Sequence, residues 1–391
     1  MAIKYVVPVL VFAALTVVAN SAQAIPAFAR KYQTDCSSCH TAFPQLNKAG
    51  RKFKEAGYRF PKLKGEETIS DFLHWGQHFP ISALVKSRPY DKKSNGDEKL
   101  RAIHEVEILI GGVLYKNVSG FMELEAEDED TNERGFEIGV AHGWLTYSFD
   151  QAANVQASWG PLLATDPYDT YSRRLTRGTP SVLDRKFGGA DNDGKLSSPR
   201  QSISIYGRPI PEHSQLYYSA GVAGVAGDSE GVNPKTVWGR LAYDVTKDVM
   251  IGLLAIDGEC EEGADDCAVD RDYKRYGIDA QADIADFRVM GVWLTAEDDN
   301  AAGTDQEDND AWYIQAQYVM KRDGRPTWAP IIRLDQWEED DGSSEFSAVT
   351  LNLSYYFTQN IKGFIEYFDL YDADNSDDEN SRFTLQIEAA F

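Results

Sequence analysis

The chain has 391 residues, with 62 acidic and 39 basic side chains and a formal net charge of −23 at pH 7. So acidic a chain repels phosphate, which argues against nucleic acid as a partner, and it attracts cations. Its length allows two domains or one large all-β domain, and beyond the first two dozen residues no apolar run is long enough for a transmembrane helix.

Residues 1–24 have the pattern of a secretory signal peptide. Lys4 gives the positive start, an apolar stretch follows from Tyr5 to about Ala19, and Ala22-Gln23-Ala24 is a small-x-small cleavage site. A transmembrane anchor is the alternative, but the stretch is short and ends at the polar pair Asn20-Ser21. We expect cleavage after Ala24 and export from the cytoplasm.

The strongest chemical signal is Cys36-Ser37-Ser38-Cys39-His40, the C-x-x-C-H pattern of covalent haem attachment. The two thiols reach the two vinyl groups of one porphyrin edge, and the following His is carried beneath the iron. A redox dithiol would stand near a βαβ pattern, and half a zinc site would need a second ligand pair; neither is visible. We expect one covalently bound haem c, with His40 as the proximal ligand.

The sequence offers several candidates for the distal haem ligand. No Met lies between residue 25 and the first expected barrel strand, which excludes a Met ligand from this segment. His74 and His78 are the local candidates, or both are surface residues; His142 is a more distant possibility. A second His would lower the reduction potential relative to Met.

The haem segment is basic, with nine Lys or Arg against two acidic residues between Ile25 and Lys64. Leu46 to Ala56 predicts a short helix that Gly57 ends. Its basic face either docks an acidic partner, docks the acidic remainder of this chain, or is simply solvated. We therefore predict a small α-helical haem domain over residues 25–78.

From about residue 79 the hydrophobic pattern changes to period two. At the C-terminus, apolar residues from Phe383 to Phe391 alternate with Thr384, Gln386 and Glu388. Similar alternation recurs upstream, as along Val237–Val245 and Val349–Phe357. A terminal aromatic residue on such a strand resembles the closing strand of outer-membrane β-barrels.

The connections between these segments alternate in length. Short turns near Lys116–Val118, Ala285–Asp286 and Thr358–Asn360 alternate with long polar loops, among them Tyr90–Lys99, Asp128–Arg134 and Pro161–Pro199. Counting the strands between them predicts an all-β fold over residues 79–391, an antiparallel transmembrane barrel of about 16 strands like a porin, embedded in outer-membrane lipid. A soluble double sandwich is the alternative.

Two long loops carry further predictions. Cys260 and Cys267 flank an acidic loop, and in an oxidising compartment they are a disulfide candidate, a metal clip being the alternative. The loop Pro161–Pro199 is rich in Arg, and a long third loop resembles the one that folds into the lumen of general porins. Its Arg173, Arg174 and Arg177 are candidates to contact haem propionates or lumen carboxylates.

The N-terminal segment resembles a known family. Ile25-Pro26-Ala27-Phe28-Ala29-Arg30, Cys36 to Thr41, Phe43 to Leu46 and Gly50 to Tyr58 are similar to the fused monohaem cytochrome–porins of the bacterial outer membrane, typified by ferrous-iron oxidases. The resemblance implies that extracellular Fe(II) gives electrons to the haem and that a periplasmic c-type cytochrome or other acceptor removes them. It places the haem domain at the periplasmic side or in the barrel lumen.

Three functional hypotheses follow. The first is an outer-membrane electron conduit, an iron:cytochrome oxidoreductase in the Fe(II) reading, with outward electron flow as a variant. The second is a solute porin whose haem domain docks or senses in the periplasm. The third is a soluble periplasmic electron carrier, which would lack the barrel.

Overall fold

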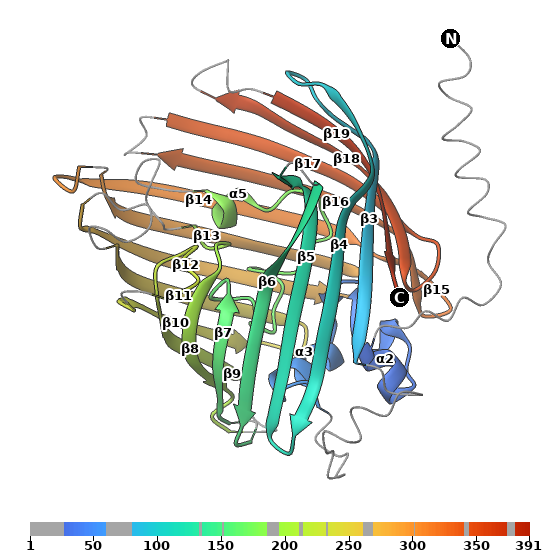
Figure 1. The fold of residues 1–391 in the computed structure, drawn as a ribbon, viewed down its shortest axis with the longest axis horizontal. Helices are drawn as coiled ribbons and strands as arrows, with labels where there is room; N and C mark the ends of the chain where they lie inside the picture. The colour runs from blue at the N-terminus through green and yellow to red at the C-terminus, as the bar shows by residue number, and fades with distance from the viewer. Residues whose placement is uncertain are drawn as a thin grey trace.

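The computed structural model describes residues 27–59, 80–132, 135–150, 152–185, 195–210, 214–231, 234–260, 269–300, 302–339, 344–373 and 380–391. Within these ranges a short N-terminal segment with two helices precedes a closed antiparallel β-barrel (Figure 1). The predicted signal peptide, residues 1–24, lies outside the described residues, and so do His74 and His78. None of the described helices is both long and apolar enough to cross a membrane.

The N-terminal segment, residues 27–59, contains α2 (Ala27–Tyr32), the 3₁₀ turn η1 (Cys36–Ser38), the two-stranded β1 (His40–Ala42) and β2 (Gln45–Leu46), and α3 (Lys48–Glu55). The predicted helix is confirmed in a slightly shorter form. Asn47 begins it, because its side chain accepts hydrogen bonds from the Ala49 and Gly50 amides. Gly57 follows its end with φ +66°, a conformation that glycine adopts without steric cost.

The described barrel wall has sixteen strand positions, each called a stave here. Its strands are β3 (Ile81–Lys93), β4 (Glu98–Tyr115), β5 (Val118–Asn132), β6 (Gly135–Ser148), β7 (Asn154–Gly160), β8 (Arg200–Gly207), β9 (Leu216–Ala223), β10 (Thr236–Asp244), β11 (Val249–Cys260), β12 (Arg271–Ile284), β13 (Phe287–Asp299), β14 (Gln306–Tyr318), β15 (Met320–Arg322), β16 (Arg325–Glu339), β17 (Ser344–Tyr356), β18 (Ile361–Ala373) and β19 (Asn380–Ala390). β14 and β15 both pair with β16 and form one stave, interrupted at Val319. β19 pairs with β3 and closes the barrel, which confirms the predicted antiparallel barrel of about 16 strands.

The barrel is apolar outside and polar inside. In β8, Ile203 and Ile205 are 60% and 48% exposed, whereas the alternating Ser202 and Ser204 are buried. In β19, Phe383 is 43% exposed and Thr384 only 1%. This alternation is the reverse of that in a water-soluble barrel and matches a strand with one face in lipid.

Two predicted loops are wrong. β3 continues to Lys93 and β4 begins at Glu98, and β5 and β6 leave only two residues between them, so most of Tyr90–Lys99 and Asp128–Arg134 is strand. The pairs here are polar, as in Lys92 opposite Glu98. Strands that extend beyond the apolar belt meet water on both faces, and they therefore lose the period-two signal.

The two barrel ends differ. Connections at 116–117, 149–153, 208–215, 245–248, 285–286, 323–324 and 357–360 form one end, named here the short-turn rim; the opposite end is the long-loop rim. The helices α2 and α3 lie at the short-turn rim (Figure 1). The long connection of residues 161–199, named the lumen loop, joins β7 to β8 as predicted and contains α5 (Ser181–Asp184).

Candidate functional site

The two motif cysteines lie on one tight turn. The Cys39 amide donates to the Cys36 carbonyl at 3.1 Å, so η1 presents both thiols from a single turn. Asn47 holds this turn: its Nδ2 donates to the Ser37 and Ser38 carbonyls at 3.1 and 3.2 Å, and its amide donates to the Cys39 carbonyl at 2.9 Å. The residue that begins α3 therefore also fixes the attachment turn.

The thiols do not resemble those of a redox dithiol. Burial raises the pKa of both Cys36 and Cys39 above the ordinary thiol value. Redox-active C-x-x-C motifs depend instead on a lowered pKa that supplies thiolate. The environment of this turn thus argues against the dithiol alternative.

His40 has one ring nitrogen engaged and one available. Its Nδ1 lies 3.1 Å from the Pro44 carbonyl oxygen, across the β1–β2 turn. A hydrogen bond at Nδ1 sets the ring orientation and leaves Nε2 for a metal. Burial lowers the pKa of His40, which favours the neutral imidazole that ligates metals. One turn with two thiols, followed by an oriented imidazole, is a donor set that fits covalent haem c.

The segment packs tightly around this site. Phe28 stacks on Tyr58 at 5.4 Å between ring centroids and meets Phe53 edge-on at 5.2 Å. Tyr58 in turn stacks near Trp144 of the barrel wall, at 6.4 Å. Gly50 touches the Cys39 carbonyl so closely that an added Cβ would overlap it. The aromatic cluster ties the segment to the wall of β5 and β6.

Polar contacts join the segment to the short-turn rim from several sides. The Cys36 amide donates to Gln359 Oε1 at 2.9 Å, and Arg51 donates to Asp283 at 3.1 Å. In further contacts of this kind the Ala27 amide donates to Ser82, Arg59 to the Lys116 carbonyl, and Arg208 to the Glu55 carboxylate. These partners belong to β3, β12 and three different turns. Much of the basic face predicted from sequence is therefore docked on this chain's own barrel.

The lumen loop folds inside the barrel, as expected. Thr170 donates to Asp279 of β12 at 2.9 Å, the Ser181 amide to Asp335 of β16 at 2.9 Å, and the Arg177 amide to Glu366 of β18 at 2.7 Å. The loop also touches the N-terminal segment. Lys54 donates to the carbonyls of residues 164 and 166, at 2.7 and 3.2 Å, and Leu175 belongs to one buried cluster with Ala42.

The three predicted propionate contacts separate into two kinds. Arg173 bonds to Asp169 at 2.5 Å and to two backbone carbonyls, and Arg177 pairs with Asp91 at 3.1 Å. Arg174 is exposed and has no hydrogen bond or ion pair within the described residues. It directly precedes Leu175, which packs with Ala42, two residues after His40. Of the three, Arg174 is the guanidinium still available for a ligand.

The other predicted site residues lie apart from this turn. His142 Nδ1 contacts Glu123 at 3.2 Å on the inner wall, and none of its described contacts involves residues 27–59. Cys260 ends β11, is buried and is disulfide-bonded; Cys267 lies outside the described residues.

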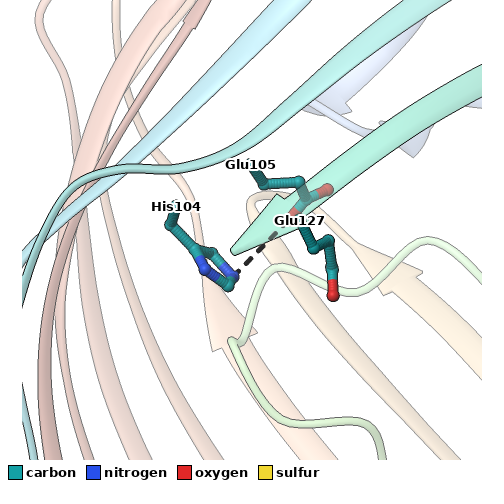
Figure 2. Close-up of side chains that lie close together, drawn as sticks. All are labelled: His104, Glu105 and Glu127. Atoms are coloured by element: carbon teal, nitrogen blue, oxygen red, sulfur yellow. Dashed lines mark ion pairs between the residues drawn. The ribbon is translucent and has the colours of Figure 1, made fainter. Parts of the chain in front are cut away.

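Sequence reasoning missed a second cluster on the inner wall of β4 and β5. His104, Glu105 and Glu127 bring ligand atoms within 4.8 Å of one another (Figure 2). Glu105, Glu107 and Glu125 do the same. The signal in the sequence is the alternation of Glu residues along both strands, which predicts a charged face opposite the apolar one. Pairing Glu105 with Glu127 requires the register, which the sequence does not display.

Comparisons with known proteins support the barrel. No family model matches the chain, and no curated protein matches it. Among solved structures, the anion-selective porin from Comamonas acidovorans is similar with a TM-score of 0.59 at 13% identity, covering 80% of this chain and 98% of that one. OmpF of Salmonella typhi in complex with daunomycin has a TM-score of 0.59 at 14% identity and covers 80% of this chain and 97% of that one. A loop-deletion mutant of OmpT from Vibrio cholerae has a TM-score of 0.54 at 13% identity and covers 80% of this chain and 98% of that one. These likenesses establish a porin-like barrel fold.

Proposed function

We propose that this protein is an electron conduit of the bacterial outer membrane. Cys36 and Cys39 hold one haem c and His40 is its proximal ligand; extracellular Fe(II) is the electron donor, and a periplasmic c-type cytochrome is the acceptor. The observation that carries the proposal is the position of the C-x-x-C-H turn, which is docked on the rim of a barrel whose outer surface is apolar.

The segment's contacts give this turn a fixed place. Gln359 holds the Cys36 amide, Asn47 holds the carbonyls of Ser37 and Ser38, and Pro44 orients His40. When bound, the haem supplies a centre that gains and loses one electron at a time. The protein's part is to keep that centre at one end of a passage through an insulating membrane, so that Fe(II) is oxidised outside and the insoluble ferric product stays there.

Arg174 has a role in this proposal. It lies on the lumen loop next to Leu175, which shares a buried cluster with Ala42, two residues after His40. Arg173 and Arg177 already pair with Asp169 and Asp91. A guanidinium recognises a carboxylate through paired N–H groups. We assign to Arg174 the contact with a haem propionate.

A solute porin with a docking or sensing haem domain is the second candidate, and the comparisons favour it: the similar structures include a porin described as anion-selective. Against a wide solute pore stands the filling of the lumen. The haem segment crosses the short-turn rim, and the lumen loop bonds to β12, β16 and β18 from inside.

The decisive experiment uses sealed proteoliposomes that enclose a soluble c-type cytochrome. Fe(II) is added outside only, and the haem bands of both proteins are followed by stopped-flow absorption. Reduction of the enclosed cytochrome supports the conduit. The control is the Cys36→Ala/Cys39→Ala barrel, which should give none.

If dithionite reduces the haem but Fe(II) does not, iron is not the donor and this proposal fails. Conductance in planar bilayers tests the alternative separately. The conduit predicts a conductance well below that of an open sixteen-stranded porin, and a porin-like conductance without electron transfer would favour the solute porin.

A further inference from the structure

A bulge in β4 brings two neighbouring side chains to the same side of the barrel wall. Between the pairs Lys86–Glu105 and Arg88–Arg101, β3 advances by two residues and β4 by four. Such extra residues re-aim side chains. As a result His104 and Glu105, which would face opposite sides of a regular strand, are each only 2% exposed.

His104 is oriented like a metal ligand. Its Nδ1 lies 2.7 Å from Asp128 Oδ1 and 3.3 Å from Arg101 Nη1, and Asp128 and Arg101 also pair with each other. When Nδ1 donates to Asp128, Nε2 carries the lone pair. Nε2 lies 3.8 Å from Glu105 Oε2, too far for a hydrogen bond, and bonds to no other described residue. A carboxylate on one ring nitrogen is the usual support of a His whose other nitrogen binds a metal.

Two carboxylates face this buried nitrogen. Glu105 comes from β4 and Glu127 from β5, directly opposite in the register, and Figure 2 shows the three side chains together. Glu105 also pairs with Lys86 through its other oxygen, and Lys86 pairs with Glu107 at 2.6 Å. Within the described residues Glu125 and Glu127 have no Lys or Arg partner. The described part of this wall therefore holds more carboxyl groups than cationic side chains.

We propose that His104 Nε2, Glu105 and Glu127 bind a divalent first-row transition-metal ion. One imidazole nitrogen and two carboxylates form a ligand set that suits Fe(II), Mn(II), Co(II) or Zn(II) better than the all-oxygen shell of Ca(II) or Mg(II). Asp128 is the positioning residue that orients His104. The site lies on β4 nearer its long-loop end than its short-turn end, whereas the N-terminal segment contacts β4 at its short-turn end, through Arg59 and the Lys116 carbonyl.

The role of this site depends on the proposed function. If Fe(II) is the donor, the cluster is where the ion is held on its way from the long-loop rim. Metal binding itself does not depend on the haem, so the two proposals fail separately.

The test is a titration of the purified, detergent-solubilised protein with Mn(II), followed by the loss of the free-ion electron paramagnetic resonance signal. We expect one saturable site. His104→Asn keeps a donor for Asp128 but removes Nε2, and Glu127→Gln keeps the side-chain shape; each should weaken binding by roughly tenfold or more, and Asp128→Asn by about 10–100-fold.

His142→Ala is the matched control. His142 also lies on the inner wall beside a glutamate, at 3.2 Å, but it belongs to no three-residue cluster in the described part of the chain. The His142→Ala variant should therefore bind Mn(II) with the same affinity as the parent protein. Absence of a saturable site would overturn the proposal. Equal binding by His104→Asn, Glu127→Gln and the parent would also overturn it and assign the affinity to other carboxylates of the chain.

A second readout separates this site from the conduit. Mn(II) should compete with Fe(II) for the cluster without reducing the haem. If Mn(II) binds at this site but Fe(II) does not reduce the haem, the metal-site proposal stands and the Fe(II) conduit is refuted. If Fe(II) reduces the haem rapidly but the protein shows no Mn(II) site, the conduit proposal stands and the metal-site proposal is refuted.

Discussion

The backbone amide of Cys36 donates to Gln359 Oε1 at 2.9 Å, so the turn between β17 and β18 holds the first residue of the C-x-x-C-H motif. Gln359 Nε2 also donates to Asp35 at 3.0 Å. One side chain thus fixes the backbone on which the thiols lie, across 323 positions of sequence.

Gln359→Ala should loosen the attachment turn without unfolding the barrel. Two hydrogen bonds are lost, each worth about 0.5–1.5 kcal/mol. Hydrogen exchange should show faster exchange at the Cys36 amide, with the strands unchanged. Lys321→Ala, which removes a surface ion pair with Asp286 on a neighbouring turn, is the control. Equal protection of Cys36 in parent and Gln359→Ala would refute the anchoring role.

Gly50→Ala should disturb the haem turn strongly. The new Cβ would overlap the Cys39 carbonyl oxygen, and two backbones must then separate, at a cost of about 1–3 kcal/mol. We expect less haem per protein, measured by the pyridine haemochrome spectrum. Gly239→Ala, where an added Cβ meets nothing within 4 Å, should leave haem content unchanged. Normal haem content in Gly50→Ala would show that the contact is not needed.

Arg174→Ala and Arg173→Ala should have different effects. If Arg174 holds a haem propionate as proposed, removing this cation favours the oxidised, more positive iron, and Arg174→Ala should lower the reduction potential in a spectroelectrochemical titration. Arg173 is bound to Asp169 and to two carbonyls, and its loss should mainly weaken the lumen loop, seen as faster hydrogen exchange there. If Arg173→Ala shifts the potential and Arg174→Ala does not, the assignment of Arg174 is wrong.

The docking of the haem segment should strengthen as the pH rises. Burial lowers the pKa of Lys54 well below its ordinary value of 10.5. Between the lowered pKa and 10.5 the released segment binds a proton that the docked one does not, so the free energy of release rises with pH across that window.

Guanidinium-induced release, followed by the haem absorption band at pH values from neutral to 10.5, measures this dependence. In Lys54→Met the slope should flatten, whereas in Lys52→Met, which alters an exposed lysine of the same helix, it should persist. An equal slope in parent and Lys54→Met would assign the dependence to another group.

Features set by neighbours in the chain were accessible from the sequence. The C-x-x-C-H spacing puts Cys36, Cys39 and His40 on one turn whatever the rest of the protein does. Alternation such as Phe383 against Thr384 defines a strand with two unlike faces, and short turns alternating with long loops predict a barrel. These signals depend only on the spacing of residues along the chain, so they can be read from the sequence without knowing the tertiary contacts.

The tertiary structure decided which of those residues act together. Arg51 meets Asp283 and Cys36 meets Gln359 only because sixteen staves close into one barrel, and the same closure commits Arg173 and Arg177 while leaving Arg174 available. His104 joins Glu105 and Glu127 through a bulge and a register that no local pattern displays. Contacts between distant residues depend on strand pairing, and pairing is settled by the whole sheet rather than by any single segment.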